Sequence, residues 1–333
     1  MTTQIYNKEM ILNQIEGGTF FGTGGGLPRD ISKSIFDSAF NIKKEIEVID
    51  VNDIDDNDIL LSAYGVGDPA DATSVESDFI KQVMRYYEKL TGYFPRAIIP
   101  GEINAESLSF LIAAILDLPV VNSDLVGGRA APEIQMDCFT LFNKPLTPTL
   151  GVAMNNKKLF LDGGFDAVEI EEIYRSFFAK NGNLGQMVGY PIKAKEYKKI
   201  GMKDTITDTQ KVGKLLLDNK LDEVLKKYNG KILVNGKLSK ENLGTKDGFT
   251  QGFIWIDDFV VKVKNENMSV TKDSKILSRA PEIIILLDDN NRPIHNSSIK
   301  NYLGKNISIC ILEAQGYWRE SDFSKIWDES VES

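Results

Sequence analysis

Segments with the hydrophobic pattern of a strand alternate with segments that have the pattern of a helix along the first half of the chain. Strand-like segments, either alternating or continuously apolar, lie at 45–51, 59–64, 96–99 and 119–121. Apolar residues at helical spacing occupy 74–90, where Ser74 would cap the helix, and 105–116. This repeated order of strand and helix predicts parallel strands joined by right-handed crossovers, with helices packed on the sheet.

The pattern changes after Pro145. Strands are expected at 146–154, 158–161 and 185–191, an amphipathic helix at 166–179 and a long helix at 205–228. Beyond them the alternation of Phe253 to Ile256 and of Val260 to Val263 is typical of antiparallel strands with one solvated face. The sequence therefore predicts an α/β protein. An N-terminal domain, with a largely parallel or mixed sheet flanked by helices, spans 1–155 and continues through packed helices and strands at 156–228, and a smaller β-rich domain spans 229–333.

Three consecutive glycines, Gly24, Gly25 and Gly26, lie between two predicted helices. The first helix begins after Asn7 and is expected to end at Gly17-Gly18, and the second begins after Pro28. Backbone without Cβ atoms next to a helix N-terminus favours an anion or a carbonyl oxygen. The run follows a helix and lacks the Gly-Lys-Ser/Thr ending of a P-loop, which argues against a nucleotide. A substrate-facing loop and a purely structural turn both remain open.

Polar residues follow three of the predicted parallel strands: Asp68, Glu102 and the run Asn122-Ser123-Asp124. Ligands of open α/β sheets bind beyond the carboxyl ends of the strands, so these side chains are expected to converge on one crevice. Asp68 and Glu102 would also suit the start of the following helices, although Glu102, like Asp124, directly follows an apolar strand, which favours a functional role.

Two further charged residues follow in the same stretch. Arg129 offers a planar fork for a carboxylate or a ring carbonyl. Glu133 follows Pro132 at an expected helix start, where a carboxylate serves either catalysis or the helix dipole.

Composition narrows the function classes. The net charge of −9 argues against a nucleic-acid interface, and the longest apolar stretch, 110–121, contains Asp117 and is too short to span a bilayer. No secretory signal is recognisable at the N-terminus, so a cytoplasmic protein is expected. Cys138 and Cys310 lie in apolar runs and are expected to be buried thiols, and the single histidine, His295, to be a solvated turn residue.

The sequence resembles the S-methyl thiohydantoin desulfurase-like family (DUF917), found with hydantoinase and oxoprolinase enzymes. The matching stretches, in order along nearly the whole chain, are residues 22–28, 100–108, 118–124, 129–136, 204–207 with Gly213, 248–252 and 280–288. The chain departs from the family in having Asn122 where Asp is usual and Leu27 where a further glycine is usual. The loss of a carboxylate at Asn122 weakens any site that needs two carboxylates there.

The resemblance implies a hydrolase acting on a hydantoin-like ring or its sulfur analogue. Asp124, Glu102 and Glu133 are the candidate catalytic residues, and Gly24, Gly25, Gly26, Arg129 and Asn122 the candidate substrate-binding residues. A divalent metal, Mg²⁺ or Zn²⁺, held by Glu102, Asp124 and Glu133 could activate the water instead.

The alternative is a non-catalytic accessory subunit of a hydantoinase or oxoprolinase complex. The expected partners are thus a small-molecule substrate and such a protein, with no nucleic acid or membrane, and a homo-oligomer remains open.

Overall fold

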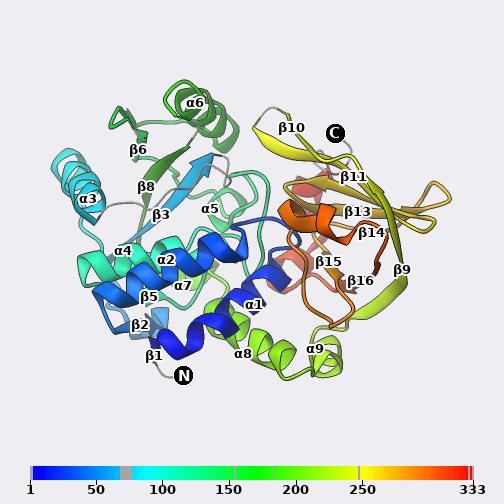
Figure 1. Ribbon diagram of the computed structural model, residues 1–333. Coiled ribbons are helices and arrows are strands. Elements are labelled where there is room, and N and C mark those ends of the chain that lie inside the picture. The colour runs from blue at the N-terminus through cyan, green and yellow to red at the C-terminus, as the bar shows by residue number, and fades with distance from the viewer. Residues whose placement is uncertain are drawn as a thin grey trace.

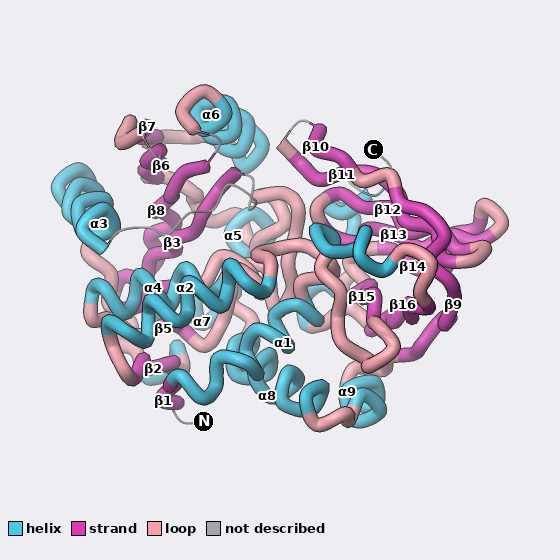
Figure 2. Tube along the Cα trace, in the orientation of Figure 1, coloured by secondary structure: helices cyan, strands magenta, loops and turns pink. Residues whose placement is uncertain are grey.

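A computed structural model describes residues 3–67, 77–153, 155–182, 184–246, 248–328 and 331. Within these residues the chain forms two sheets that lie side by side, with helices gathered on the first (Figures 1 and 2). The predicted helix cap Ser74 and the strand-end residue Asp68 lie outside the described residues.

The first sheet is mixed. Its strand order is β1 (Gln4–Asn7), β2 (Glu45–Ile49), β5 (Val120–Val121), β4 (Ala97–Ile99), β3 (Ile59–Gly67), β8 (Leu184–Lys193), β6 (Thr149–Ala153) and β7 (Lys158–Leu161). Strands β2, β5, β4 and β3 are parallel to one another, as the alternation of strand and helix predicts, whereas β1 and the group β8, β6 and β7 pair antiparallel.

Helices cover both faces of this sheet. One face packs on α1 (Ile11–Phe21), α2 (Arg29–Ile42), α3 (Ser77–Thr91) and α4 (Glu106–Leu116), and the other on α5 (Cys138–Leu141), α6 (Ala167–Ala179) and α7 (Ala194–Ile200). Adjacent strand residues such as Ile98 and Ile99 therefore enter different cores, which explains why the parallel strands are continuously apolar.

The second sheet is antiparallel. Its order is β14 (Lys275–Arg279), β13 (Glu266–Lys272), β12 (Phe259–Lys264), β11 (Phe249–Ile256), β9 (Lys231–Glu241), β16 (Asn306–Leu312) and β15 (Ile283–Leu287), with β10 (Gly244–Lys246) paired to β11. The predicted fold class, an α/β region plus a β-rich C-terminal region, is confirmed. The predicted domain boundaries at 155 and 228 remain predictions, although the chain passes from the first sheet to the second after α9 (Leu221–Lys227).

Helix α1 runs through Gly17-Gly18, so the prediction that these glycines end it is wrong. Their role is close packing against α8 (Thr205–Leu217): a Cβ on Gly17 would lie 1.9 Å from the carbonyl oxygen of Thr209, and one on Gly213 would lie 1.8 Å from that of Asn13. Glycine at both points lets the two backbones touch, and the helix continues because tertiary packing outweighs the low helix propensity of glycine.

Two other helix predictions need correction. The long helix expected at 205–228 is two helices, α8 and α9, separated by Asp218 to Lys220. No helix starts at Glu133, where the chain runs through turns until α5 begins at Cys138. Both cysteines are buried free thiols, as predicted. In the described part of the chain no helix combines the length and the apolar character needed to cross a bilayer.

Candidate active site

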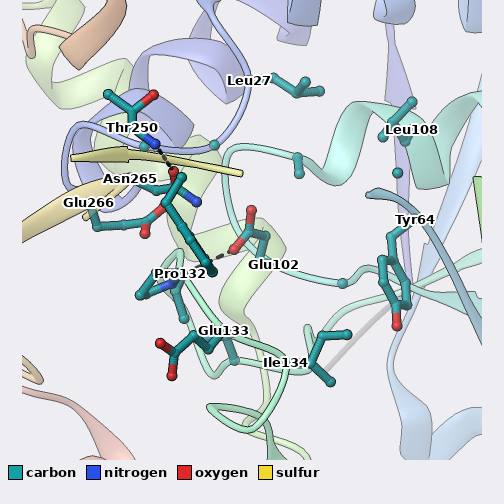
Figure 3. Close-up of a pocket in the computed structure, with 18 of the residues that line it drawn as sticks. Leu27, Tyr64, Glu102, Leu108, Pro132, Glu133, Ile134, Thr250, Asn265 and Glu266 are labelled. Carbon is teal, nitrogen blue, oxygen red and sulfur yellow. Dashed lines mark hydrogen bonds between the residues drawn. The ribbon is translucent and has the colours of Figure 1, made fainter. Parts of the chain in front are cut away.

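A cavity of about 370 Å³ lies between the two sheets. The first sheet contributes the glycine loop, the ends of β3 and β4 and the stretch that follows β5; the second contributes the β10–β11 region, the turn before β13 and residues 295–297. We call this space the inter-sheet cavity (Figure 3). Its position beyond the carboxyl ends of β3, β4 and β5 agrees with the crevice predicted from the topology.

The glycine loop borders this cavity and is held by asparagine side chains and backbone. The Asn104 side-chain amide donates to the carbonyl oxygens of Gly25 and Leu27, at 2.7 and 3.1 Å. The amide of Asn296 donates to the carbonyl of Gly24 at 2.8 Å. Gly24 and Gly26 have φ angles of +89° and +73°, which explains glycine at both positions. Among the described residues no hydrogen-bond partner exists for the amides of Gly24 and Gly26.

Glu102 follows β4 and lines the inter-sheet cavity, as the strand-end prediction expected. Its Oε2 accepts a hydrogen bond of 3.0 Å from the amide of Ala131. Burial raises the pKa of Glu102 to about 8, and the negative charges of Asp124 and Glu106 raise it too, against the opposing effects of the Ala131 amide and the Arg129 guanidinium. Glu102 is therefore a carboxyl group that holds a proton near neutral pH.

Glu266 is a second carboxyl group of the cavity, and the sequence analysis did not identify it. It is the first residue of β13 and only 1% exposed. Its Oε1 lies against Gly25, where a Cβ would be 2.0 Å away, and its buried Oε2 has no hydrogen-bond partner among the described residues. Burial, and next the charge of Glu102, hold the pKa of Glu266 well above its usual range. In Figure 3 the Glu266 side chain points toward the side of the cavity where Glu102 lies.

Arg129 lies outside the cavity lining. Its side chain is 1% exposed; Nε donates to the carbonyl of Ala130 at 3.1 Å, Nη1 donates to that of Pro281, and the guanidinium carbon lies 4.1 Å from the centroid of the Trp327 ring. Its charge interacts with Glu266 and Glu102, while burial lowers the pKa of Arg129 to about 10. Arg129 therefore acts on the carboxyl pair through its positive charge. Its predicted contact with substrate remains a prediction.

Asp124 does not line the cavity, although it follows β5 as predicted. Its two carboxylate oxygens accept hydrogen bonds from the amides of Val126, Gly127 and Gly128, at 2.9, 2.7 and 2.7 Å. Burial raises the pKa of Asp124 to about 6 despite these bonds. The side chain shapes the turn that leads to Arg129, which is a positioning role.

Asn122 likewise lies outside the lining. Its amide donates to Asp204 Oδ1 at 3.0 Å and to Thr207 Oγ1 at 3.2 Å, and its Oδ1 accepts from the amide of Thr207 at 3.1 Å. These bonds tie the end of β5 to the start of α8.

Glu133 lines the cavity but is paired. It forms a salt bridge with Lys264, and its Oε2 accepts a hydrogen bond of 2.6 Å from the side chain of Gln135. The metal-ligand set predicted from Glu102, Asp124 and Glu133 needs correction. The carboxylate of Asp124 accepts hydrogen bonds from backbone amides, and that of Glu133 forms a salt bridge with Lys264. In the described ranges no three or more His, Cys, Asp or Glu side chains are grouped to hold a metal ion.

His295 is 8% exposed, so the expectation of a solvated turn residue is wrong. The residue lines the cavity and contacts the glycine loop, because Nε2 donates to the carbonyl of Gly26 at 3.1 Å. Nδ1 then accepts from the amide of Ser297 at 3.2 Å, which fixes the tautomer because a backbone amide can only donate. Burial lowers the pKa of His295, so the ring is neutral and serves to hold the loop.

The fold belongs to a class of two-part proteins, an α/β region joined to an antiparallel β-rich region, and here a cavity lies between the two. Family models for the S-Me-THD-like N-terminal and C-terminal domains match residues 11–163 and 166–327. The chain therefore belongs to the S-Me-THD-like family, and the resemblance stated from its sequence is confirmed.

A crystal structure of a protein from Chromobacterium violaceum is similar, with a TM-score of 0.81 and 18% sequence identity over 99% of this chain and 96% of that chain. At this identity the similarity shows a shared fold alone. No curated protein matches the sequence.

Proposed function

We propose that this protein hydrolyses a hydantoin-like or S-methyl thiohydantoin-like five-membered ring, with Glu102 and Glu266 as its acid and base. Membership of the S-Me-THD-like family supports a hydantoin-related function. The observation that carries the proposal is the pair of carboxyl groups at the wall of the inter-sheet cavity, both with raised pKa values.

Such a pair provides both functions that hydrolysis needs. Two carboxyl groups whose charges repel each other do not both ionise readily, so when one of them has released its proton the other keeps its own. The carboxylate accepts a proton from water and the protonated group donates one to the ring, an arrangement in which each catalytic group has the protonation state that its step requires.

For an S-methyl thiohydantoin the proposed reaction forms and breaks the following bonds. The carboxylate removes a proton from water as the water oxygen bonds to the carbon that carries the S-methyl group, and the protonated partner gives its proton to the ring nitrogen of the C=N bond. The carbon–sulfur bond then breaks, the oxygen becomes a carbonyl, and methanethiol leaves with the second proton of the water. The products are a hydantoin and methanethiol, and no electrons are gained or lost.

The glycine loop is suited to the charge that develops during this addition. Gly24 and Gly26 line the cavity, and their amides have no hydrogen-bond partner among the described residues. Backbone amides fixed in place stabilise a negative oxygen or nitrogen at low reorganisation cost. We assign the loop this donor role.

The test is turnover by the purified chain. S-methyl thiohydantoin is supplied and methanethiol is measured with a thiol reagent, while ring opening of hydantoin is followed by chromatography, each with and without added Mg²⁺ or Zn²⁺. We expect turnover that falls about 10²- to 10⁴-fold in Glu102→Gln, the usual contribution of a general acid or base. Absence of turnover of both rings under all these conditions would overturn the proposal.

A second candidate, the accessory subunit, is favoured by one surface feature. Strand β14 ends the second sheet, and its adjacent residues Ile276 and Leu277 are 57% and 43% exposed. An exposed apolar edge strand is a surface for pairing with another chain. Co-purification with a hydantoinase- or oxoprolinase-like protein, combined with turnover only in the complex, would favour this role.

A further inference from the structure

The inter-sheet cavity has two chemically different ends. Glu102, Glu133, Thr250, Asn265 and Glu266 lie at one end, and Leu27, Tyr64, Leu108 and Ile134 at the other (Figure 3). Asp137 also lines the cavity, and its charge adds to burial in raising the pKa of Tyr64, but its Oδ1 accepts a hydrogen bond of 2.7 Å from the amide of Thr140. Ile35 of α2 adds a further apolar side chain to the lining. The acid and base of the proposed reaction are therefore confined to one part of the space.

A bare five-membered ring with two amide groups has no use for the apolar end. Small-molecule sites are mostly apolar, with a few polar groups that fix the orientation of the ligand, and volumes of about 300 Å³ or more. The cavity, at about 370 Å³, is of this kind. When the ring lies against Glu102 and Glu266, whatever is attached to the ring extends toward Leu108 and Tyr64.

We infer that the apolar end binds a hydrophobic substituent on the ring, so that the substrates are hydantoins or S-methyl thiohydantoins derived from aliphatic or aromatic amino acids. This inference rests on the proposed function, because it takes the ring to bind at the carboxyl pair. It adds a specificity site formed by Leu27, Ile35, Tyr64, Leu108 and Ile134.

The backbone at this end leaves space for the substituent. Gly65 of β3 lines the cavity, and a Cβ at that position would lie 3.3 Å from Cδ1 of Leu108. A side chain there would narrow the space beside Leu108. Gln186, which pairs with Gly65 in the sheet, borders the cavity too and provides one amide for a water or a polar tip.

The experiment compares rings that differ only in the substituent: none, methyl, isobutyl, benzyl and carboxymethyl. Dissociation constants are measured by calorimetry on Glu102→Gln, so that binding is separated from turnover, and kcat/KM is measured on the wild type. We expect isobutyl and benzyl rings to bind at least about 10-fold more tightly than the unsubstituted ring, since each methylene in an apolar pocket contributes about 10-fold or more. The carboxymethyl ring should bind most weakly.

Two variants test the assignment of the apolar end. Leu108→Asn should remove most of the preference for isobutyl and benzyl, while Leu116→Asn, the same change at the other end of α4 and outside the cavity lining, should keep it. If Leu108→Asn does not fold, Gly65→Ala serves instead and should weaken benzyl binding more than binding of the unsubstituted ring.

The outcomes separate the two claims. Equal kcat/KM for all substituents would overturn the specificity site while the proposed reaction stands. A substituent preference in binding without any turnover by the wild type would support the specificity site and overturn the reaction. Failure of every ring to bind would overturn the inference.

Discussion

The negative charge of Glu102 raises the pKa of Glu266 across the inter-sheet cavity, although the two residues belong to different sheets. Glu102 follows β4 of the first sheet and Glu266 begins β13 of the second. The interaction is mutual, because two carboxyl groups that repel each other release their protons as a pair. The carboxyl pair therefore exists only when both halves of the chain are folded against each other.

The pair makes stability depend on pH. Between the ordinary glutamate pKa of 4.5 and its value of about 8, folded Glu102 keeps a proton that the unfolded chain has released. The free energy of unfolding should therefore fall as pH rises through this window and level off above it. Glu102→Gln removes this contribution. The melting temperature of the variant minus that of the wild type should therefore increase as the pH rises from 5 to 9.

Thermal melts of the wild type and of Glu102→Gln across this pH range measure the difference in melting temperature. Over this range the free energy of unfolding of Glu102→Gln should increase relative to that of the wild type by a few kcal/mol at most, given about 1.4 kcal/mol for each unit of pKa shift. A constant difference in melting temperature at all pH values would show that Glu102 has no raised pKa.

Gly25→Ala should displace the Glu266 carboxylate. The added Cβ would lie 2.0 Å from Oε1 of Glu266, so the carboxylate or the loop must move. We expect kcat/KM to fall at least about 10-fold, the effect of misplacing a reacting group, with a stability loss of about 1–3 kcal/mol from overpacking. Gly164→Ala is the matched control, since no atom lies within 4 Å of its Cβ position. Equal activity in the two variants would contradict the contact between the loop and Glu266.

Asp124→Asn should act on stability more than on catalysis. Asn has one acceptor oxygen for three amides that the Asp124 carboxylate now satisfies, so at least one amide loses its partner. The expected cost is about 1–3 kcal/mol in the free energy of unfolding, measured by urea denaturation. The kcat/KM of the folded variant should exceed that of Glu102→Gln by at least about 10-fold. An unchanged stability with activity as low as that of Glu102→Gln would make Asp124 the base after all.

The sequence was sufficient to predict Glu102 because its position depends on local order. A buried strand followed by Pro100-Gly101-Glu102 places a carboxylate at the carboxyl end of a parallel sheet, and the structure has it there. The glycine loop was predicted for a related reason, since three glycines before a helix start permit the positive φ angles that Gly24 and Gly26 adopt.

Glu266 and His295 could not be placed from the sequence. Glu266 follows a short turn between two antiparallel strands, and nothing in its neighbours Asn265 and Asn267 indicates that the second sheet brings it against Gly25. His295 is buried where it contacts Gly26, which lies 269 residues away in the sequence. Both positions depend on how the two sheets pack, and strand periodicity carries no information about that.

The sequence around Asp124 also contains a turn signal, which the strand-end prediction does not use. An aspartate two to four residues before Val126, Gly127 and Gly128 is well placed to accept hydrogen bonds from their amides, as aspartates in turns commonly do. The end of β5 sets the position of Asp124 along the chain, whereas the turn amides determine where its carboxylate points.

The most direct test of the central claim is the pH dependence of kcat/KM for S-methyl thiohydantoin in the wild type, Glu102→Gln and Glu266→Gln. The account predicts a bell-shaped profile for the wild type that declines above about pH 8, where Glu102 loses its proton. It predicts losses of about 10²- to 10⁴-fold in both variants. Glu106→Gln, a buried neighbour outside the cavity lining, should keep activity within a few-fold of wild type. Turnover within a few-fold of wild type in both Glu102→Gln and Glu266→Gln would contradict the account.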